Sequence, residues 1–252
     1  MHPTVVHYLS LEAAQRTLSR EDRGEPLSPE ERAFAEAARA APGWRGELAA
    51  AGSHPSKHVQ EALLVIAAQA AARLLRGDPR VGPALAEADA AMRQAGAGAA
   101  DVERAVAALV LEEAFGDEES PDEFDEAFFL ESVGSLGPLA SLTRERVDAL
   151  VERFSGSAPE GWKAAYGAAA RALLEAAWPE GAQPVNPEHV QEAAERVLER
   201  VAAPEGERAL EALRRFLEAL HHEGLVGGER LRRLSDAVNA AALELSRGAD
   251  PS

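Results

Sequence analysis

Histidine spacing offers the first candidate chemistry in this chain. His54 and His58 lie four residues apart, close to a predicted helix start. Two imidazoles at this spacing can share a metal ion, but a usable site needs further ligands, and the HExxH arrangement with its glutamate base is absent. Pro55 also favours a position of His54 outside the helix. We therefore predict no metal site and no cofactor, and His54 and His58 remain the weak candidates for ligation.

The segment from Arg215 to His222 holds the other side chains that could do chemistry. Glu218 and His221 have the i, i+3 spacing of carboxylate di-iron bundles, but those sites need the motif twice and it occurs once here. Arg215 also precedes His221 with five residues between them. This spacing resembles that of the HEPN-type ribonucleases, all-helical proteins in which the arginine and the histidine act on the RNA backbone. The resemblance covers one helix and implies catalytic roles for Arg215 and His221.

The charge balance limits the classes of partner. The chain has 252 residues, with 43 acidic and 26 basic side chains, and its formal charge is −17. An acidic surface repels phosphates, so we expect no direct binding of nucleic acid. The same charge allows a nucleic-acid mimic, in which carboxylates imitate phosphates. The absence of cysteine excludes disulfides, thiolate metal sites and cysteine nucleophiles.

Apolar residues recur at intervals of three and four along the chain, and no run of β-branched and aromatic residues alternates with period two. The pattern predicts an all-α fold of about ten helices. The first predicted helix spans residues 5–19, and Ser28-Pro29-Glu30-Glu31 marks a helix start with a capping box. Residues 57–76 are apolar on nearly all sides and predict a central buried helix. Near the end of the chain, one apolar stripe comprises Leu210, Leu213, Phe216, Leu217 and Leu220.

An acidic run with a proline, residues 117–123, separates two halves of the chain. It is not an EF-hand, because Asp122 stands where the glycine is needed and Phe128 where the bidentate glutamate is needed. The aromatic residues that follow, Phe124, Phe128 and Phe129, either cover a core or form a docking surface for a partner. We take these three as the candidate binding residues.

The two halves, residues 1–118 and 119–252, share a sequence match. His58-Val59-Gln60-Glu61-Ala62 recurs as His189-Val190-Gln191-Glu192-Ala193, and weaker matches keep the same spacing. A duplication would give two five-helix halves related by a pseudo-twofold axis, either as two domains or packed as one. Coincidence of composition is the alternative, because the chain is rich in alanine and glutamate.

No stretch approaches the length of a membrane span, and the amino terminus lacks the basic and apolar regions of a secretory signal. The default expectation is a soluble cytoplasmic protein. Without a complete catalytic set, the sequence favours a non-catalytic interaction or regulatory module that binds another protein. The alternatives are a nuclease-like enzyme that uses Arg215 and His221, and a nucleic-acid mimic. A homo-oligomer is left open.

Overall fold

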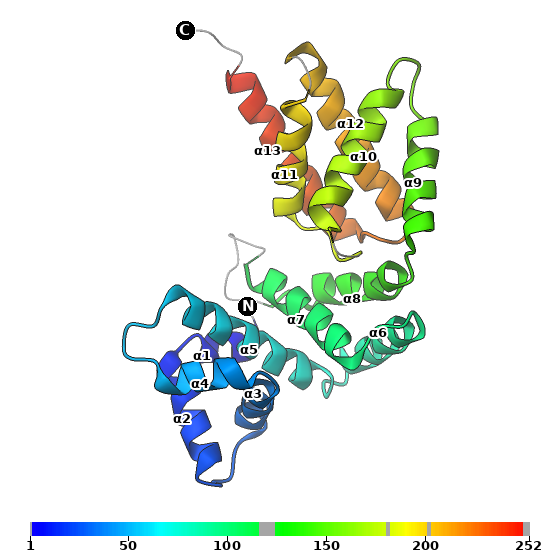
Figure 1. The fold of residues 1–252 in the computed structure, drawn as a ribbon. Helices are drawn as coiled ribbons and strands as arrows, with labels where there is room; N and C mark the ends of the chain where they lie inside the picture. Colours follow the sequence, from blue (N-terminus) through cyan, green and yellow to red (C-terminus); the bar gives the residue numbers. More distant parts are fainter. Residues whose placement is uncertain (1, 116–123, 180–181, 201–202, 249–252) are drawn as a thin grey trace. The chain divides into compact units, whose positions relative to one another are not determined.

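The computed structural model describes residues 2–115, 124–179, 182–200 and 203–248. These residues form thirteen α-helices and no strand, which confirms the predicted all-α class (Figure 1). None of the helices in these ranges is both long and apolar enough to cross a lipid bilayer.

Local caps explain why there are more helices than the roughly ten that the periodicity predicts. The predicted helix at residues 5–19 is two helices, α1 (Pro3–Tyr8) and α2 (Leu11–Asp22). Ser10 Oγ accepts the backbone N–H of Ala13 at 3.3 Å, so the chain starts a new helix there. In the same way α4 (Pro42–Ala50) follows α3 (Pro29–Ala40) almost directly. Pro42 suits a first helical position because it has no N–H to satisfy.

The chain divides into two compact units, residues 1–133 and 134–252. The boundary predicted at 118/119 falls within residues 116–123, outside the described residues. The first unit contains α1 to α4 and four further elements: α5 (Lys57–Leu75), α6 (Gly82–Gln94), α7 (Ala99–Phe115) and the first part of α8 (Glu126–Ala140).

Helix α5 is the centre of the first unit, as its all-round apolar sequence predicts. It contacts α1, α3, α4 and α7 (Figure 1). Small buried side chains on α3 and α5, such as Ala37 and Ala67, allow the two helices to pack closely. Against this surface the ring of Tyr8 stacks on Phe34, with ring centroids 4.0 Å apart, and the Tyr8 hydroxyl lies 3.2 Å from Thr17 Oγ1. These contacts fix α1 on α2 and α3.

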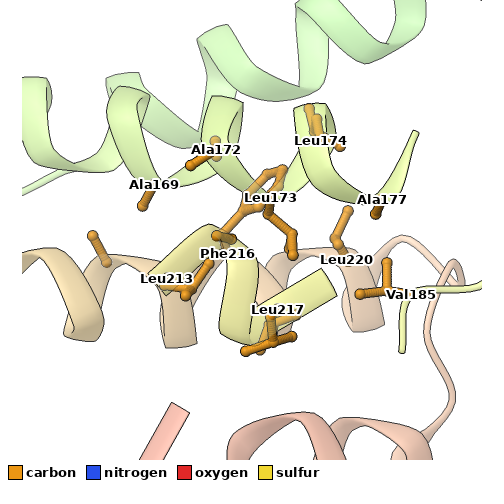
Figure 2. Close-up of a cluster of buried hydrophobic side chains, with 14 of the residues drawn as sticks. Ala169, Ala172, Leu173, Leu174, Ala177, Val185, Leu213, Phe216, Leu217 and Leu220 are labelled. Carbon is orange, nitrogen blue, oxygen red and sulfur yellow. The ribbon is translucent and has the colours of Figure 1, made fainter. Parts of the chain in front are cut away.

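The second unit begins with the last part of α8. It also contains α9 (Arg144–Gly156), α10 (Lys163–Ala177), α11 (Pro187–Leu198), α12 (Ala203–His222) and α13 (Gly228–Gly248). Helix α10 contacts α9, α11 and α12, and α13 contacts α11 and α12. Figure 2 shows Leu213, Phe216 and Leu220 of α12 facing Ala169 and Leu173 of α10. The Phe216 ring lies 4.9 Å from Phe154, which stacks on Tyr166 at 4.5 Å. The apolar stripe predicted on α12 is therefore part of the core of this unit.

A histidine forms part of the cap of α11. Asn186 Oδ1 accepts the backbone N–H of His189 at 2.9 Å, and His189 Nδ1 accepts the backbone N–H of Asn186 at 3.2 Å. Glutamate or glutamine usually completes such a capping box. Burial and the charge of Arg230 lower the pKa of His189, and these effects outweigh the opposite effects of Glu192 and Glu188. His189 therefore accepts the hydrogen bond as a neutral imidazole.

The second unit is expected to lose stability as the pH falls below about 6.5, the ordinary pKa of histidine. Between that value and the lower pKa of folded His189, the unfolded chain binds the proton more readily, so acid favours unfolding. His189→Gln keeps an acceptor at this position and does not titrate. Urea unfolding at pH 7.5 and 5.5 should show a smaller pH dependence for His189→Gln than for the wild type or for His222→Gln, whose side chain is exposed. Equal losses in all three proteins would contradict the expectation.

Candidate functional site

The two candidate metal ligands of the first unit lie at the start of α5. His54 precedes the helix, as Pro55 predicts, and its Nδ1 lies 3.1 Å from Ser53 Oγ. His58 is in the first turn, and its Nε2 lies 3.2 Å from Glu47 Oε2. Both side chains are exposed. Within the described ranges, no group of three or more His, Asp or Glu side chains is arranged to hold a metal ion.

Arg215 and His221 have different neighbours on α12. Arg215 Nε donates to Glu211 Oε1 at 2.9 Å, and Arg215 Nη1 donates to Glu218 Oε2 at 3.0 Å. His221 Nδ1 donates to the Val226 carbonyl at 2.8 Å, in the turn before α13. Six residues correspond to a helical rotation of about 600°, so the two side chains leave α12 about 120° apart. The structure does not bring them together, and Glu218 contacts the arginine rather than the histidine.

The three phenylalanines near the start of α8 differ in exposure. Phe128 is 3% and Phe129 1% exposed, which favours the core-covering alternative for both. Phe124 is half-buried, and its ring lies 5.3 Å from Phe129 and 5.4 Å, edge to face, from the imidazole of His2. Of the three candidate binding residues, Phe124 is the one that reaches the surface.

The imidazole of His2 lines a hollow that no sequence motif indicates. The hollow has a volume of about 760 Å³ and lies between α1, the start of α3 and the end of α5. It is lined by His2, Pro3, Thr4, His7, Tyr8, Ser28, Glu30, Glu31, Leu74, Leu75 and Asp78. Tyr8 and Leu75 are buried and Leu74 is half-buried, so the floor is apolar. We call this feature the α1 hollow.

Carboxylates form the rim of the α1 hollow. Glu30 Oε2 accepts from Ser28 Oγ at 2.9 Å, and its own backbone N–H and this hydroxyl lower the pKa of Glu30. The backbone N–H of Arg80 is the main cause of the lowered pKa of Asp78. Glu31 accepts the Ser28 N–H at 2.8 Å and pairs with Arg20. These hydrogen bonds favour the ionised carboxylates, so Glu30 and Asp78 are negative at neutral pH.

The imidazole of His2 does little to offset this charge at neutral pH. Burial lowers the pKa of His2, with a smaller contribution from the N-terminal amine, so its neutral form is favoured. His2 Nδ1 accepts the backbone N–H of Thr4 at 3.3 Å and caps α1. None of the described residues that line the hollow is lysine or arginine. The site is a concave, partly apolar surface with a negative rim.

The fold and this hollow define an all-α protein with an acid-rimmed surface site in its first unit. We found no match to a protein-family model, to a curated protein or to a solved structure.

Proposed function

We propose that this chain is a non-catalytic protein-interaction module of the cytoplasm, and that its partner binds in the α1 hollow. The observation that carries the proposal is the combination of an apolar floor and a charged rim in a hollow of about 760 Å³. Binding pockets have volumes of this order, and their few polar groups orient the ligand over an apolar surface. Phe124 extends the apolar surface through its contact with His2.

The hydrogen bonds of the rim support binding rather than catalysis. Ser28 Oγ donates to Glu30 and accepts the backbone N–H of Glu31 at 3.2 Å, so this hydroxyl caps α3. A nucleophilic serine would instead be hydrogen-bonded to a general base such as histidine. On α12, both Glu211 and Glu218 hold Arg215, and this pairing gives no support to the nuclease alternative. The nucleic-acid-mimic alternative stays a prediction.

A pair of neighbouring substitutions on α1 tests the location of the binding site. His7 is exposed and lines the hollow, whereas Val6 is 52% exposed and does not line it. His7→Trp places a large ring in the hollow, and Val6→Trp places the same ring on another face of the same helix. Both positions are at the surface, so we expect both variants to fold, with circular dichroism as the check.

Affinity capture from the cytoplasm of the source cells should retain a protein with the wild type and with Val6→Trp. With His7→Trp, recovery of that protein should fall by about tenfold, because the ring excludes the partner from the floor. Equal recovery with all three baits would overturn the proposal. Loss with Val6→Trp alone would overturn it as well, because it would move the interface to another face of α1.

A further inference from the structure

The segment before α11, residues 182–186, is held in the second unit by side chains rather than by its own backbone. Within the described part of the chain, residues 182–185 make no backbone-to-backbone hydrogen bond. Segments with so few backbone bonds open locally while the rest of a domain stays folded. Independently of the α1 hollow, we infer that this segment is released by acid: when His189 takes up a proton, residues 182–186 leave the core while the helices of the second unit stay folded.

The first half of the segment is attached to the end of α10. Gln183 Nε2 donates to the Ala177 carbonyl at 2.7 Å, and Trp178 Nε1 donates to the Gln183 carbonyl at 2.7 Å. Two residues further on, Val185 has no exposed surface and belongs to the buried cluster that also contains Leu220 (Figure 2). Release of the segment would therefore expose Val185 and free the Trp178 indole N–H, and both changes can be measured.

The second half of the segment is attached to α13 and α11. Arg230 Nη1 donates to the Val185 carbonyl at 2.8 Å, and the backbone N–H of Asn186 donates to His189 Nδ1 at 3.2 Å. Only the neutral imidazole can accept at Nδ1, because both ring nitrogens of the charged form are donors. A proton on His189 would leave the Asn186 N–H facing a second donor, without an acceptor. It would also place a positive charge at the positive end of the α11 dipole.

The surroundings of His189 disfavour the proton while the segment is in place. Glu192 and Glu188, on the same helix, favour the protonated form, and Arg230 of α13 disfavours it. Among the described residues, α10 and α12 contribute no charge to this balance. Burial is the largest effect, so the pKa of His189 lies below its ordinary value. An imidazole with the ordinary pKa of about 6.5 in the released segment favours release by up to about tenfold at pH 5.5.

A single thiol in place of Val185 tests the release, because the chain has no cysteine of its own. Val185→Cys keeps a small apolar side chain. Val238→Cys is the matched control, since Val238 of α13 is equally buried in the same cluster. The rate of reaction with dithiodipyridine is divided by the rate of the same variant unfolded in urea at the same pH, which removes the effect of pH on the thiol itself.

At pH 5.5 the normalised rate of Val185→Cys should be at least about tenfold higher than that of Val238→Cys. It should also be insensitive to low concentrations of urea, because local release exposes little surface. Equal normalised rates would show that the segment opens only when the whole unit unfolds, and would overturn the inference.

His189→Gln, added to Val185→Cys, tests the role of the proton. Between pH 7.5 and 5.5 the normalised rate should rise at least about threefold when His189 is present and stay constant with glutamine. His222→Gln, at an exposed position of the same unit, should leave the rise intact. A rise of the same size with His189→Gln would mean that another group controls the segment, and the inference would fail.

The Trp178 indole N–H gives a second measurement in a chain without an added thiol. By NMR at pH 5.5, this proton should exchange with solvent at least about threefold faster in the wild type than in His189→Gln, because release removes its bond to Gln183. At pH 7.5 the two proteins should exchange at similar rates. Equal exchange in both proteins at pH 5.5 would show that the segment stays in place when His189 is protonated, and would overturn the inference even if Val185→Cys did not fold.

Discussion

Phe216→Ala is expected to lower the free energy of unfolding of the second unit by about 4 kcal/mol. Phe216 has no exposed surface and lies between α12 and α10, with its ring 4.9 Å from Phe154 (Figure 2). Its neighbours on α10 are mainly alanines and leucines, which are too short to fill the space of a lost ring. The cost therefore includes a cavity as well as the lost burial of the aromatic side chain.

Arg215→Ala is the matched control for this substitution. Arg215 precedes Phe216 on α12, is exposed, and forms ion pairs with Glu211 and Glu218. Losing exposed pairs of this kind costs less than about 1 kcal/mol. The two variants should be compared by urea unfolding in a Trp44→Phe background. The remaining tryptophans, Trp162 and Trp178, both belong to the second unit and report its unfolding. Similar losses from Phe216→Ala and Arg215→Ala would contradict the assigned core.

The sequence predicted the fold class because helical patterns are local. The stripe from Leu210 to Leu220 repeats every three to four residues, and all five of its members are buried. The capping box at Ser28 is present as predicted, with both of its hydrogen bonds. Apolar periodicity continues across Ser10, so it does not predict the break between α1 and α2. A single serine cap, worth about 1 kcal/mol, was enough to divide that segment into two helices.

The α1 hollow could not be predicted in this way because three separate segments form it. His7, Glu30 and Leu74 are distant in sequence, and each has an ordinary local explanation as a surface histidine, a first-turn glutamate and a core leucine. The one residue in the sequence that indicates a surface site near the hollow is Phe124, a large apolar residue that follows an acidic run. Its ring contacts His2 at the edge of the hollow. Phe128 and Phe129, which have the same residue type and a similar position, are instead buried.

The internal duplication stays a prediction, and the two matching helices can be compared in detail. At the predicted offset of 131 some pairs agree in burial, such as Ile66 of α5 and Val197 of α11, which are both buried. Others do not, because Ala68 is buried and its counterpart Glu199 is exposed. The caps differ by one position, because Ser56 caps the N–H of Val59 whereas Asn186 caps that of His189. As a result His58 and His189, which match in sequence, occupy different positions in their first turns. The exposed His58 pairs with Glu47, whereas His189 completes a capping box.

Buried charge was the feature of the second unit that sequence patterns could not indicate. Arg230 is 2% exposed, although it lies among the charged residues Glu229, Arg232 and Arg233 at the start of α13. Its Nη1 donates to the carbonyl of Val185 at 2.8 Å. This bond holds the segment before α11 against α13. In a helical pattern, Arg230 cannot be distinguished from Arg232, because both are arginines next to Leu231.

Arg230→Ala is expected to destabilise the second unit by about 3 kcal/mol, because it removes a hydrogen bond from a charged donor, leaves the Val185 carbonyl without that donor and opens a cavity. Arg232→Ala is the matched control. The Arg232 side chain is 63% exposed and pairs with Glu229 and Asp236, so its loss should cost less than about 1 kcal/mol. Urea unfolding followed by tryptophan fluorescence measures both variants.

A second measurement distinguishes loss of this charge from a general loosening of the unit. The charge of Arg230 contributes to the lowered pKa of His189, so Arg230→Ala should move that pKa back toward its ordinary value while Arg232→Ala leaves it unchanged. Titration of the histidine by NMR, under conditions where both variants are folded, gives the two pKa values. If Arg230→Ala unfolds no more readily than Arg232→Ala and the His189 pKa does not rise, Arg230 does not hold the segment before α11. If the pKa rises without loss of stability, the charge acts on His189 but the bond to Val185 contributes little to folding.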